Sequence, residues 1–228
     1  MKVGIGAVQF GMNYGVSNSA GKPSTAEIKK ILDIAASNRV RIIDTATIYG
    51  NSEEVLGMTW PNCYSFNVVT KTARFSKPVI KEADAQQLED TLNRSLRNMR
   101  IPSVYGLLIH HADDILVDGG QLLIEKMLEL KQKGLIEKIG VSVYTAEQID
   151  RVLDKYCVDL IQLPISILDQ RLLQSGHIKK LKKNGIEIHA RSVFLQGLLL
   201  MDPETLPSYF DAIKAHLLKY REYLKRYN

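Results

Sequence analysis

Cysteine is scarce in this chain, because the 228 residues include only Cys63 and Cys157. Two isolated cysteines are too few and too far apart for a disulfide framework or for a zinc site, both of which need larger sets at short spacings. Cys157 lies between Tyr156 and Val158, so we expect a reduced thiol that is packed among apolar neighbours.

Long apolar runs are absent as well. The first residues, Met1 to Gly6, lack the apolar region of a signal peptide, and no stretch of the chain approaches the length of a transmembrane helix. We therefore expect a cytoplasmic protein without a membrane partner.

The chain is mildly basic but has no recognisable nucleic-acid-binding motif. Its net charge is +5, and much of the excess lies in residues 179–183 and 214–226. We expect these segments to be solvated helix faces with no nucleic-acid partner. With 45% hydrophobic and 24% charged residues, the composition is that of a globular protein, and the length predicts one domain over residues 1–228.

What the chain does contain is a regular alternation of strand-like and helix-like segments. Ser24 and Glu27 form a capping box before the first helix, and Gly134 and Gly185 follow two others as stop signals. The predicted helices are 26–38, 83–99, 122–133, 146–155 and 172–184; the predicted strands are 3–10, 40–45, 65–71, 104–110, 138–143, 159–163 and 187–192. This pattern predicts an α/β fold, a TIM-type (β/α)8 barrel with about seven of its units.

Polar residues stand at or just after the ends of three successive predicted strands. They are Asp44, Lys71 and His110, and Tyr49 lies in the loop that follows the strand of Asp44. In a barrel of parallel strands the carboxyl ends open onto one face, where the chemistry takes place. A carboxylate, an ammonium, an imidazole and a phenol are therefore expected at one mouth.

An open doubly wound sheet is the alternative fold. A Rossmann domain needs a G-x-G-x-x-G turn that leads from its first strand directly into a helix. Gly4 and Gly6 instead lie inside the first predicted strand, and Gly11 and Gly15 precede a polar stretch, 13–23, that we interpret as a loop over the barrel mouth. The Rossmann alternative is therefore disfavoured.

A series of motifs, taken in order, resembles the aldo-keto reductase superfamily. They are Gly4-x-Gly6 with Gln9-Phe10-Gly11, the block from Asp44 to Glu53, Val69-Thr70-Lys71, Leu108-Ile109-His110 and Ile139-Gly140-Val141-Ser142. The resemblance extends to about Leu200, and segments 162–164 and 191–199 are similar to bacterial members encoded among surface-sugar biosynthesis genes. It implies reduction of a carbonyl compound with NADPH, or with NADH, held without a Rossmann domain.

By this resemblance Tyr49 is the proton donor, assisted by Asp44, Lys71 and His110. Hydride addition to a carbonyl group builds negative charge on its oxygen, so a proton donor must stand beside it. Tyrosine has an ordinary pKa near 10, and we expect Lys71 to lower the pKa of Tyr49 while Asp44 keeps the lysine charged. His110 would orient the carbonyl oxygen or help deliver the proton, and His111 is expected to point away from the barrel lumen.

Each of the four residues also has a purely structural interpretation. Asp44 could cap a turn, Tyr49 could rest on the barrel rim, Lys71 could be solvated and His110 could be an interior histidine with its hydrogen bonds satisfied. Their order on successive strand ends favours a shared role over four unrelated ones.

The resemblance also implies a cofactor site. Ser142 and Gln162 would hydrogen-bond the nicotinamide carboxamide, although Val143 stands where the family usually has an asparagine. Arg191 occupies the position of an aromatic residue under the nicotinamide, and a planar guanidinium can also stack. The pyrophosphate would be lined, mainly by backbone N–H groups, at Ser192, Phe194 and Gly197.

The sequence departs from the family pattern after Leu200, where one amphipathic segment, about 204–228, follows. We count seven strands, whereas a complete barrel has eight. The last βα unit, which in the family holds the adenosine 2′-phosphate, is expected to be missing, so the sequence does not choose between NADPH and NADH. The first and seventh strands would then lack partners, and a homo-oligomer or the folded tail could cover that edge.

Two functions from different classes stay open. One is a reductase of a small aldehyde, ketone or sugar carbonyl; the other is a degenerate barrel that acts as a binding or interaction module. A metal-dependent hydrolase is disfavoured because the first strand has no His-x-His, and we predict no metal site. A Schiff-base aldolase would need Lys71 with a lowered pKa, whereas we expect Asp44 to raise it.

Overall fold

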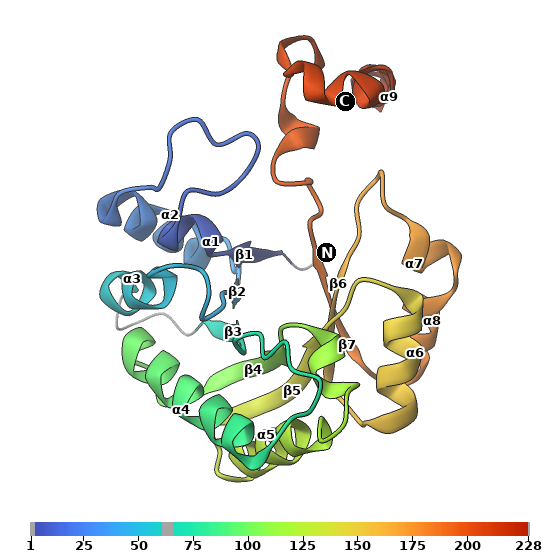
Figure 1. The fold of residues 1–228 in the computed structure, drawn as a ribbon. Coiled ribbons are helices and arrows are strands. Elements are labelled where there is room, and N and C mark those ends of the chain that lie inside the picture. Colours follow the sequence, from blue (N-terminus) through green and yellow to red (C-terminus); the bar gives the residue numbers. More distant parts are fainter. Residues whose placement is uncertain (1–2, 61–65, 228) are drawn as a thin grey trace.

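The computed structural model describes residues 3–60 and 66–227, and one parallel sheet forms its centre (Figure 1). The strands follow one another across the sheet in the order of the sequence. They are β1 (Gly4–Gly6), β2 (Ile42–Asp44), β3 (Asn67–Lys71), β4 (Val104–Ile109), β5 (Ile136–Ser142), β6 (Leu160–Pro164) and β7 (Glu187–Arg191). Among the described residues β1 pairs only with β2 and β7 only with β6, so the curled sheet is an incomplete (β/α) barrel and the predicted fold class is confirmed.

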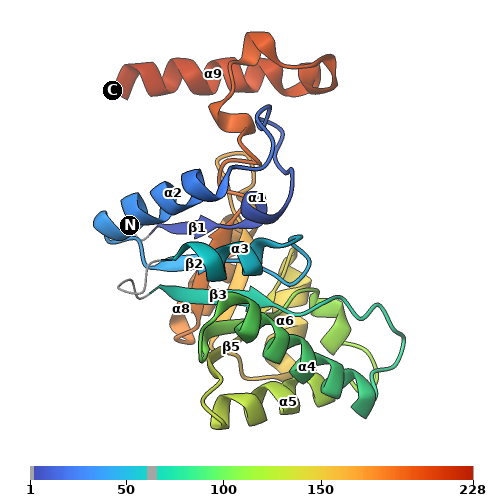
Figure 2. The same cartoon turned by 90° about the vertical axis from the view of Figure 1, so that its left-hand side faces the viewer.

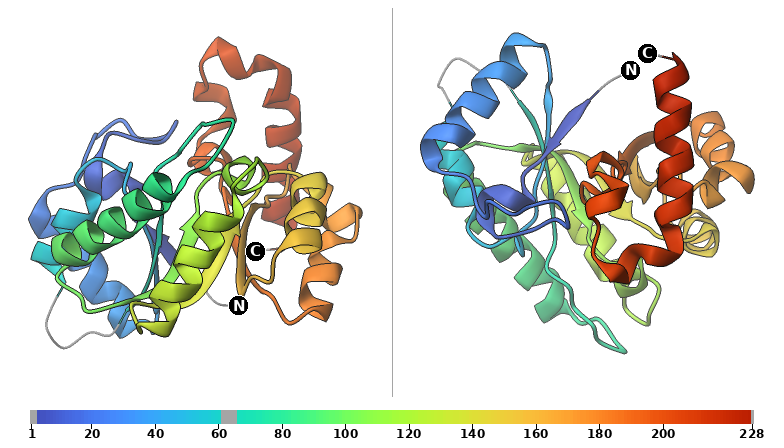
Figure 3. Two further views of the ribbon diagram at one scale, coloured as in Figure 1. Left: turned by 60° about the horizontal axis from the view of Figure 1, so that its bottom comes forward. Right: turned by 90° about the horizontal axis from the view of Figure 1, so that it is seen from above.

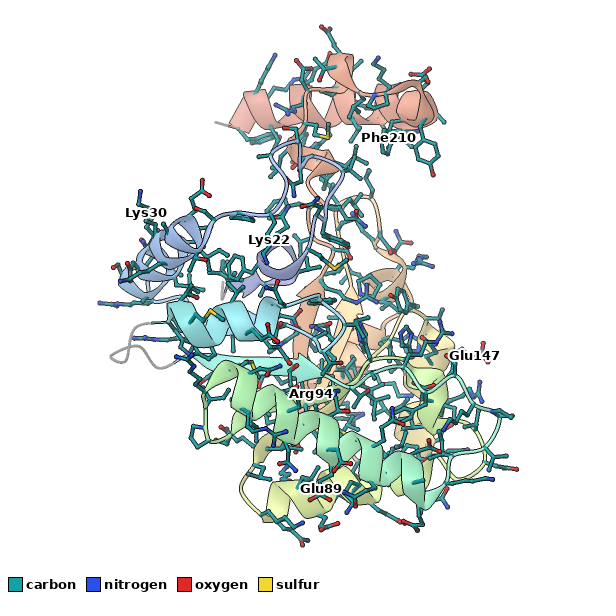
Figure 4. All side chains as sticks on the ribbon, turned by 60° about the vertical axis from the view of Figure 1, so that its left-hand side comes forward. Lys22, Lys30, Glu89, Arg94, Glu147 and Phe210 are labelled. Carbon is teal, nitrogen blue, oxygen red and sulfur yellow. The ribbon has the colours of Figure 1, made fainter. Side chains whose placement is uncertain are left out.

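Helices cover the outer side of the curled sheet, as the views in Figure 3 show. They are α2 (Thr25–Ser37), α3 (Ser52–Thr59), α4 (Glu82–Met99), α5 (Gln121–Gln132), α6 (Ala146–Lys155), α7 (Arg171–Gln174) and α8 (His177–Lys183), with a 3-10 turn, η1 (Ala112–Ile115), after β4. Their inner faces bury leucine, isoleucine and methionine side chains against the sheet. On the outside, Glu89 of α4 accepts hydrogen bonds from Lys126 and Lys133 of the α5 region (Figure 4).

Local signals in the sequence explain where several helices begin and end. The Ser24 hydroxyl accepts a hydrogen bond from the Glu27 backbone N–H, and the Glu27 carboxylate accepts one from the Ser24 N–H, which completes the predicted capping box. The Thr145 hydroxyl accepts from the Gln148 N–H at the start of α6. Gly134 and Gly185 have positive φ and follow α5 and α8, as their stop signals predicted.

Two predicted elements differ clearly from the structure, and one helix was missed. The predicted strand 3–10 ends at Gly6, because the chain turns at Ala7 into α1 (Val8–Gly11), which buries Phe10. The predicted helix 172–184 is divided into α7 and α8 at Gly176, whose φ is +80°. Helix α3 was not predicted at all.

Cys157 is exposed, not packed as expected, whereas Cys63 and Ser65 lie outside the described residues.

The C-terminal segment forms an apolar cluster of its own. Helix α9 (Asp211–Tyr227) follows the 3-10 turns η2 (Leu198–Leu200), η3 (Pro203–Thr205) and η4 (Ser208–Phe210), so regular α-helix begins later than the predicted residue 204. In Figure 2, α9 stands apart from the sheet and its covering helices. The cluster buries Leu198, Leu199, Leu206 and Leu217. No helix of the described residues is long and apolar enough to cross a membrane.

Candidate active site

The register of the sheet places the expected site residues on one face. It pairs Gly6 with Asp44, Lys71 with Leu108, and Ser142 with Gln162. Side chains of paired residues point to the same side of a parallel sheet, and alternate residues along a strand share that side. Asp44, Lys71 and Ser142 end their strands and His110 follows β4, so all of them reach the same end of the lumen.

Asp44 and Lys71 form a buried ion pair at this end. The Lys71 side chain is 1% exposed, and its Nζ lies 2.8 Å from both carboxylate oxygens of Asp44. Nζ also donates to the Thr45 carbonyl oxygen at 2.8 Å. The three acceptors use all three N–H bonds of the ammonium, so its position is fixed.

Tyr49 and His110 lie next to this pair. Lys71 Nζ is 5.1 Å from the centroid of the Tyr49 ring. The Tyr49 and His110 rings meet edge to face, with centroids 6.1 Å apart and an interplanar angle of 84°. The structure therefore brings together the four residues that the strand ends and the following loop predicted.

A backbone-to-backbone contact holds the loop of Tyr49. Gly50 has a φ of +57°, and a Cβ there would lie 2.4 Å from the carbonyl oxygen of Gly11. A Cβ on Gly11 would lie 1.8 Å from the Tyr49 carbonyl oxygen. Beside this contact the Ser52 hydroxyl donates to the Ala7 carbonyl at 2.8 Å. Only glycine at both positions allows the backbone at the end of α1 to contact the backbone of the Tyr49 turn this closely.

Burial controls the protonation of this group. It lowers the pKa of Lys71 by more than the Asp44 carboxylate raises it, so Asp44 acts in the expected direction but the net shift is downward. A Schiff-base role does not follow, because Nζ is buried and fully engaged as a donor. Burial, and then the negative charge of Asp44, raises the pKa of Tyr49.

The expected lowering of the Tyr49 pKa by Lys71 is therefore not observed. Both carboxylate oxygens of Asp44 are in contact with the Lys71 ammonium, so the pair presents little net positive charge to the phenol. Arg191 is the cation whose charge lowers the pKa of Tyr49, and its effect is smaller than that of burial.

His110 is held as a neutral imidazole. Burial, followed by the charge of Lys71, lowers its pKa to about 4. Its backbone N–H donates to the Thr72 hydroxyl at 3.2 Å, and its Nδ1 is buried without a hydrogen-bond partner. His111 stacks on His110 with ring centroids 4.9 Å apart, so it does not point away as predicted.

Gln162 links the ion pair to the expected nicotinamide site. Its Nε2 donates to Asp44 Oδ1 at 2.7 Å, whereas its Oε1 is buried and has no partner. Ser142 lies beside it in the register and is 3% exposed. Val143 turns its side chain into the core among the apolar residues.

Arg191 ends β7 and reaches back toward the loop after β5. Its Cζ lies 4.0 Å from the centroid of the Tyr144 ring, and its Nη2 donates to the Val143 carbonyl at 3.3 Å. Tyr144 was not singled out in the sequence, although it follows the carboxyl end of a strand and the strand-end rule applies to it.

The loop after β7 has an unusual backbone. Ser192, Leu195 and Gln196 all have positive φ values although none is glycine, and Gly197 follows with a φ of +91°. Such conformations cluster at ligand-binding sites. The N–H groups of Leu195 and Gly197 donate to the Ser192 and Phe194 carbonyls within the loop. Phe194 of the same loop is 54% exposed.

The polar stretch 13–23 meets this loop, as expected of a segment that lies over the mouth. The Ser17 backbone N–H donates to the Gln196 carbonyl at 3.4 Å, and the Ser17 side chain packs on Gly197. Lys22 of the same stretch, labelled in Figure 4, donates to the Asn51 side chain next to the Tyr49 turn.

A family model for the aldo/keto reductase family matches residues 2–227. The chain belongs to this family. It is 28% identical over 177 residues to an NADH-specific methylglyoxal reductase of Escherichia coli, a match that covers 70% of this chain and 54% of the reductase. The chain thus spans about half the length of that curated relative.

Solved aldo-keto reductases share the fold. A holo-form aldo-keto reductase from Bacillus halodurans superposes with a TM-score of 0.71 at 22% identity, covering 91% of this chain and 66% of the other. An aldo-keto reductase from Bombyx mori in complex with NADP gives a TM-score of 0.63 at 21% identity, over 96% and 72% of the two chains.

The lumen of this aldo/keto reductase family member has hydrogen-bonding groups that suit a nicotinamide carboxamide. Gln162 already uses its N–H₂ group on Asp44, so its buried Oε1 needs a donor, and the carboxamide N–H₂ is one. Ser142 offers a hydroxyl on the neighbouring strand. Within the described ranges, no group of three or more His, Cys, Asp or Glu side chains is placed to hold a metal ion.

Proposed function

We propose that this chain is an oxidoreductase that reduces an aldehyde, a ketone or a sugar carbonyl to the alcohol with NADPH or NADH. The observation that supports this most directly is the bidentate Asp44–Lys71 pair beside the Tyr49 and His110 rings. Such a set can stabilise charge that develops on a carbonyl oxygen and can supply a proton to it.

In the proposed reaction Tyr49 donates its phenolic proton to the carbonyl oxygen. When bound, the reduced nicotinamide supplies the hydride that the carbonyl carbon receives. The oxygen gains negative charge as the hydride arrives and becomes a stronger base than a phenolate, so the proton moves to it although the pKa of Tyr49 is raised beforehand. The phenol must carry its proton before this step, which the raised pKa ensures at neutral pH.

The other three residues have supporting roles in this proposal. His110, neutral at pH 7 because its pKa is about 4, is able to donate one hydrogen bond to the carbonyl oxygen without adding a charge. Lys71 stands beside Tyr49 as the phenolate forms, and Asp44 holds it in place. Because the pair has little net charge, the positive charge that stabilises the phenolate comes mainly from Arg191.

For the cofactor site we propose Ser142 and Gln162 at the carboxamide, Arg191 near the nicotinamide, and the loop after β7 at the pyrophosphate. The loop would contribute through Ser192, Phe194 and Gly197, and the positive φ of Ser192 and Gly197 is typical of a strained ligand-binding loop. The curated relative is named NADH-specific and the Bombyx mori structure contains NADP, so we propose NADPH with NADH as the alternative. Titration with each nucleotide distinguishes them.

The substrate proposed is a small carbonyl compound, in keeping with the methylglyoxal reductase among the relatives. A single domain over residues 1–228, a cytoplasmic location and a homo-oligomer that covers the open sheet edge stay predictions. The open edge between β1 and β7 also favours the second candidate, a barrel that works as a binding or interaction module.

The decisive experiment is Tyr49→Phe. This change removes the proton but keeps the ring, so we expect carbonyl reduction to fall by about 10²–10⁴-fold while the dissociation constant for NADPH changes little. The matched control is Tyr209→Phe, on the C-terminal segment, where the side chain is 87% exposed. Both are measured by NADPH oxidation with a panel of aldehydes and sugars, and by nucleotide binding.

Two outcomes count against the proposal. If Tyr49→Phe retains more than about a tenth of the wild-type rate, Tyr49 does not contribute the rate enhancement expected of a general acid. If the wild-type chain binds nucleotide saturably but reduces no member of the panel, the interaction module becomes the better candidate.

A further inference from the structure

Arg191 carries a charge that no acid of the described chain balances. It is half-buried at the mouth of the lumen, and among residues 3–60 and 66–227 no carboxylate lies within ion-pair distance of its guanidinium. Arg171, which also follows the carboxyl end of a strand, shows the contrast: its guanidinium forms two hydrogen bonds with the Asp169 carboxylate. Burying part of a guanidinium without a counter-ion costs free energy unless a ligand or another polar group binds it.

The guanidinium of Arg191 is also held in one orientation. One face lies 4.0 Å above the Tyr144 ring, and one N–H group donates to the Val143 carbonyl. A guanidinium has five N–H donors in a fixed planar fork that matches a carboxylate or a phosphate. Most of these donors have no acceptor in the described chain, so the fork is positioned in advance for an anion.

The charges around Arg191 favour an anion further. The ammonium of Lys71 is matched by Asp44, whereas Arg74, an exposed arginine near His111, has no ion pair among the described residues. The acids whose charges act on His111 are Asp114 and Asp113. Asp114 accepts hydrogen bonds from two backbone N–H groups and Asp113 accepts one from Gln148, so neither is paired with an arginine.

Arg191 stands close enough to the proposed catalytic residues to act on the same small molecule. The register pairs Gln162 with His189, so Arg191, two residues further on, shares the lumen side of Gln162, whose amide contacts Asp44. An aromatic residue at the end of β7 could only stack on a ligand, whereas an arginine can also bind a negative group.

We propose that Arg191, supported from behind by Tyr144, binds an anionic group of the substrate, so that the chain selects carbonyl compounds that carry a carboxylate or a phosphate. This rests on the proposed reductase function, which it deepens by naming the substrate class. The carbonyl group would lie at Tyr49 and His110, the nicotinamide near Arg191 as proposed above, and the anion on the N–H groups of the guanidinium edge that do not bond Val143.

The test compares substrates that differ in charge but not in the reacting group. The first pair is 4-formylbenzoate and its methyl ester, and the second is glyceraldehyde 3-phosphate and glyceraldehyde. We measure kcat and KM for each with the wild type, Arg191→Met, Arg191→Lys and the control Arg171→Met. Dissociation constants for 4-(hydroxymethyl)benzoate and its methyl ester are measured by calorimetry and do not depend on turnover.

We expect Arg191→Met to lower the charged-to-neutral ratio of kcat/KM by about 10- to 100-fold, mostly through KM, because a hydrogen bond to a charged group is worth about 1.5–3 kcal/mol. Arg191→Lys should restore part of the ratio, since it keeps the charge but not the fork. Arg171→Met should leave the ratio unchanged. The pair with the larger effect tells whether the site suits a carboxylate or a phosphate.

Other results would overturn the proposal. If Arg191→Met lowers kcat/KM equally for charged and neutral substrates and weakens NADPH binding in parallel, Arg191 serves the nucleotide and not the substrate. If the wild type binds 4-(hydroxymethyl)benzoate no better than its ester, the anion site does not exist. If the wild type shows no turnover but still binds 4-(hydroxymethyl)benzoate better than its methyl ester, the reductase function is wrong and the anion site is supported.

Discussion

Lys71 shows how much of the site depends on a single buried contact. Its side chain is 1% exposed, and its ammonium is compensated by the two oxygens of Asp44 and by the Thr45 carbonyl. Removing one partner of a buried pair leaves an uncompensated charge, whereas removing both leaves none. The pair is therefore a structural unit as well as part of the proposed catalytic set.

This gives a prediction on stability. Asp44→Asn should lower the free energy of unfolding by about 3–5 kcal/mol, and adding Lys71→Met should recover part of that loss, because the stranded ammonium is then gone. Urea unfolding of the wild type, the two single variants and the double variant measures this. If the losses of the two single variants simply add, the two side chains do not depend on each other as the 2.8 Å contacts imply.

His110 predicts a pH dependence of stability. Its folded-state pKa of about 4 lies below its ordinary value of 6.5. Between these pH values the unfolded chain binds a proton that the folded chain does not, so this contribution to stability is fully present above pH 6.5 and falls as the pH drops toward 4. His110→Gln should therefore lose less stability than the wild type between pH 7 and pH 5.

The control for this experiment is His216→Gln, on an exposed part of α9. It should keep the wild-type difference between the two pH values in urea unfolding. An unchanged pH difference in His110→Gln as well would mean that His110 is not shielded from protons in the folded chain.

At the residue scale the sequence was a good guide wherever position along a strand decides what a side chain meets. Asp44, Lys71 and His110 could be placed because the ends of parallel strands share one face. The stacking of His111 on His110 and of Tyr144 on Arg191 could not, because loop residues follow the packing of rings and not a periodic pattern. The direction of the Lys71 and Tyr49 pKa shifts was also missed, since burial is a property of the whole fold.

Among the elements, α1 and the turn before α3 are in direct backbone contact, and the position of Tyr49 depends on this contact. Their backbones touch at Gly11 and Gly50, and the Ser52 hydroxyl bonds both the Ala7 carbonyl and the Thr45 hydroxyl. In the sequence these glycines were read as parts of a motif. The structure gives the physical reason, which is a contact too close for a side chain.

Gly11→Ala tests this backbone contact. The added Cβ would lie 1.8 Å from the Tyr49 carbonyl oxygen, so the turn must move and with it the Tyr49 ring. We expect a loss of about 1–3 kcal/mol in stability. If Tyr49 is the proton donor, a shift of about 1 Å should also lower reductase activity by up to about 10²-fold.

The matched variant for stability is Gly6→Ala, because a Cβ on Gly6 would meet no atom within 4 Å. Chemical denaturation of both variants, together with NADPH oxidation by Gly11→Ala, measures the effects. Equal stability of the two variants would show that the α1 contact is not tight.

Elements with a clear apolar period were predicted well, and the short ones were not. Helix α4 repeats leucine on its buried face, whereas α3 is only eight residues long and buries residues on nearly every side, so no amphipathic stripe marks it. Strand β1 was predicted too long because Val8 and Phe10 are apolar in either conformation, and the turn at Ala7 is fixed by contacts with the β2 and α3 regions.

On the scale of the whole molecule, the described chain has three apolar clusters, of which a small one around Val69, Leu108 and Leu160 belongs to the strands of the sheet. The other two differ in size and in position. The larger lies between the sheet and its helices, and the smaller, around Leu198, Leu199, Leu206 and Leu217, lies under α9. Since α9 stands apart in Figure 2, its stability should depend mainly on the smaller cluster.

Leu217→Ala should therefore loosen the C-terminal segment but not the barrel. Leu217 is 2% exposed, and its truncation should cost that segment about 2–5 kcal/mol. Hydrogen exchange followed by mass spectrometry should show faster exchange in α9 and unchanged protection in β3 to β5. Leu218→Ala, at a position 39% exposed on the same helix, should change neither region, and a global change in Leu217→Ala would mean that the two clusters unfold together.

The order of the strands has a consequence for how the chain folds. Every described strand pairs only with its neighbours in sequence, so each pairing closes one crossover that contains at least one helix, and none has to join more distant parts of the chain. Pairing two such strands costs the chain entropy of the whole crossover, so we expect strand pairing to be slower than the formation of the helices. A nascent chain can thus add one strand at a time, from β1 onward, to an edge that is already in place when the next strand leaves the ribosome.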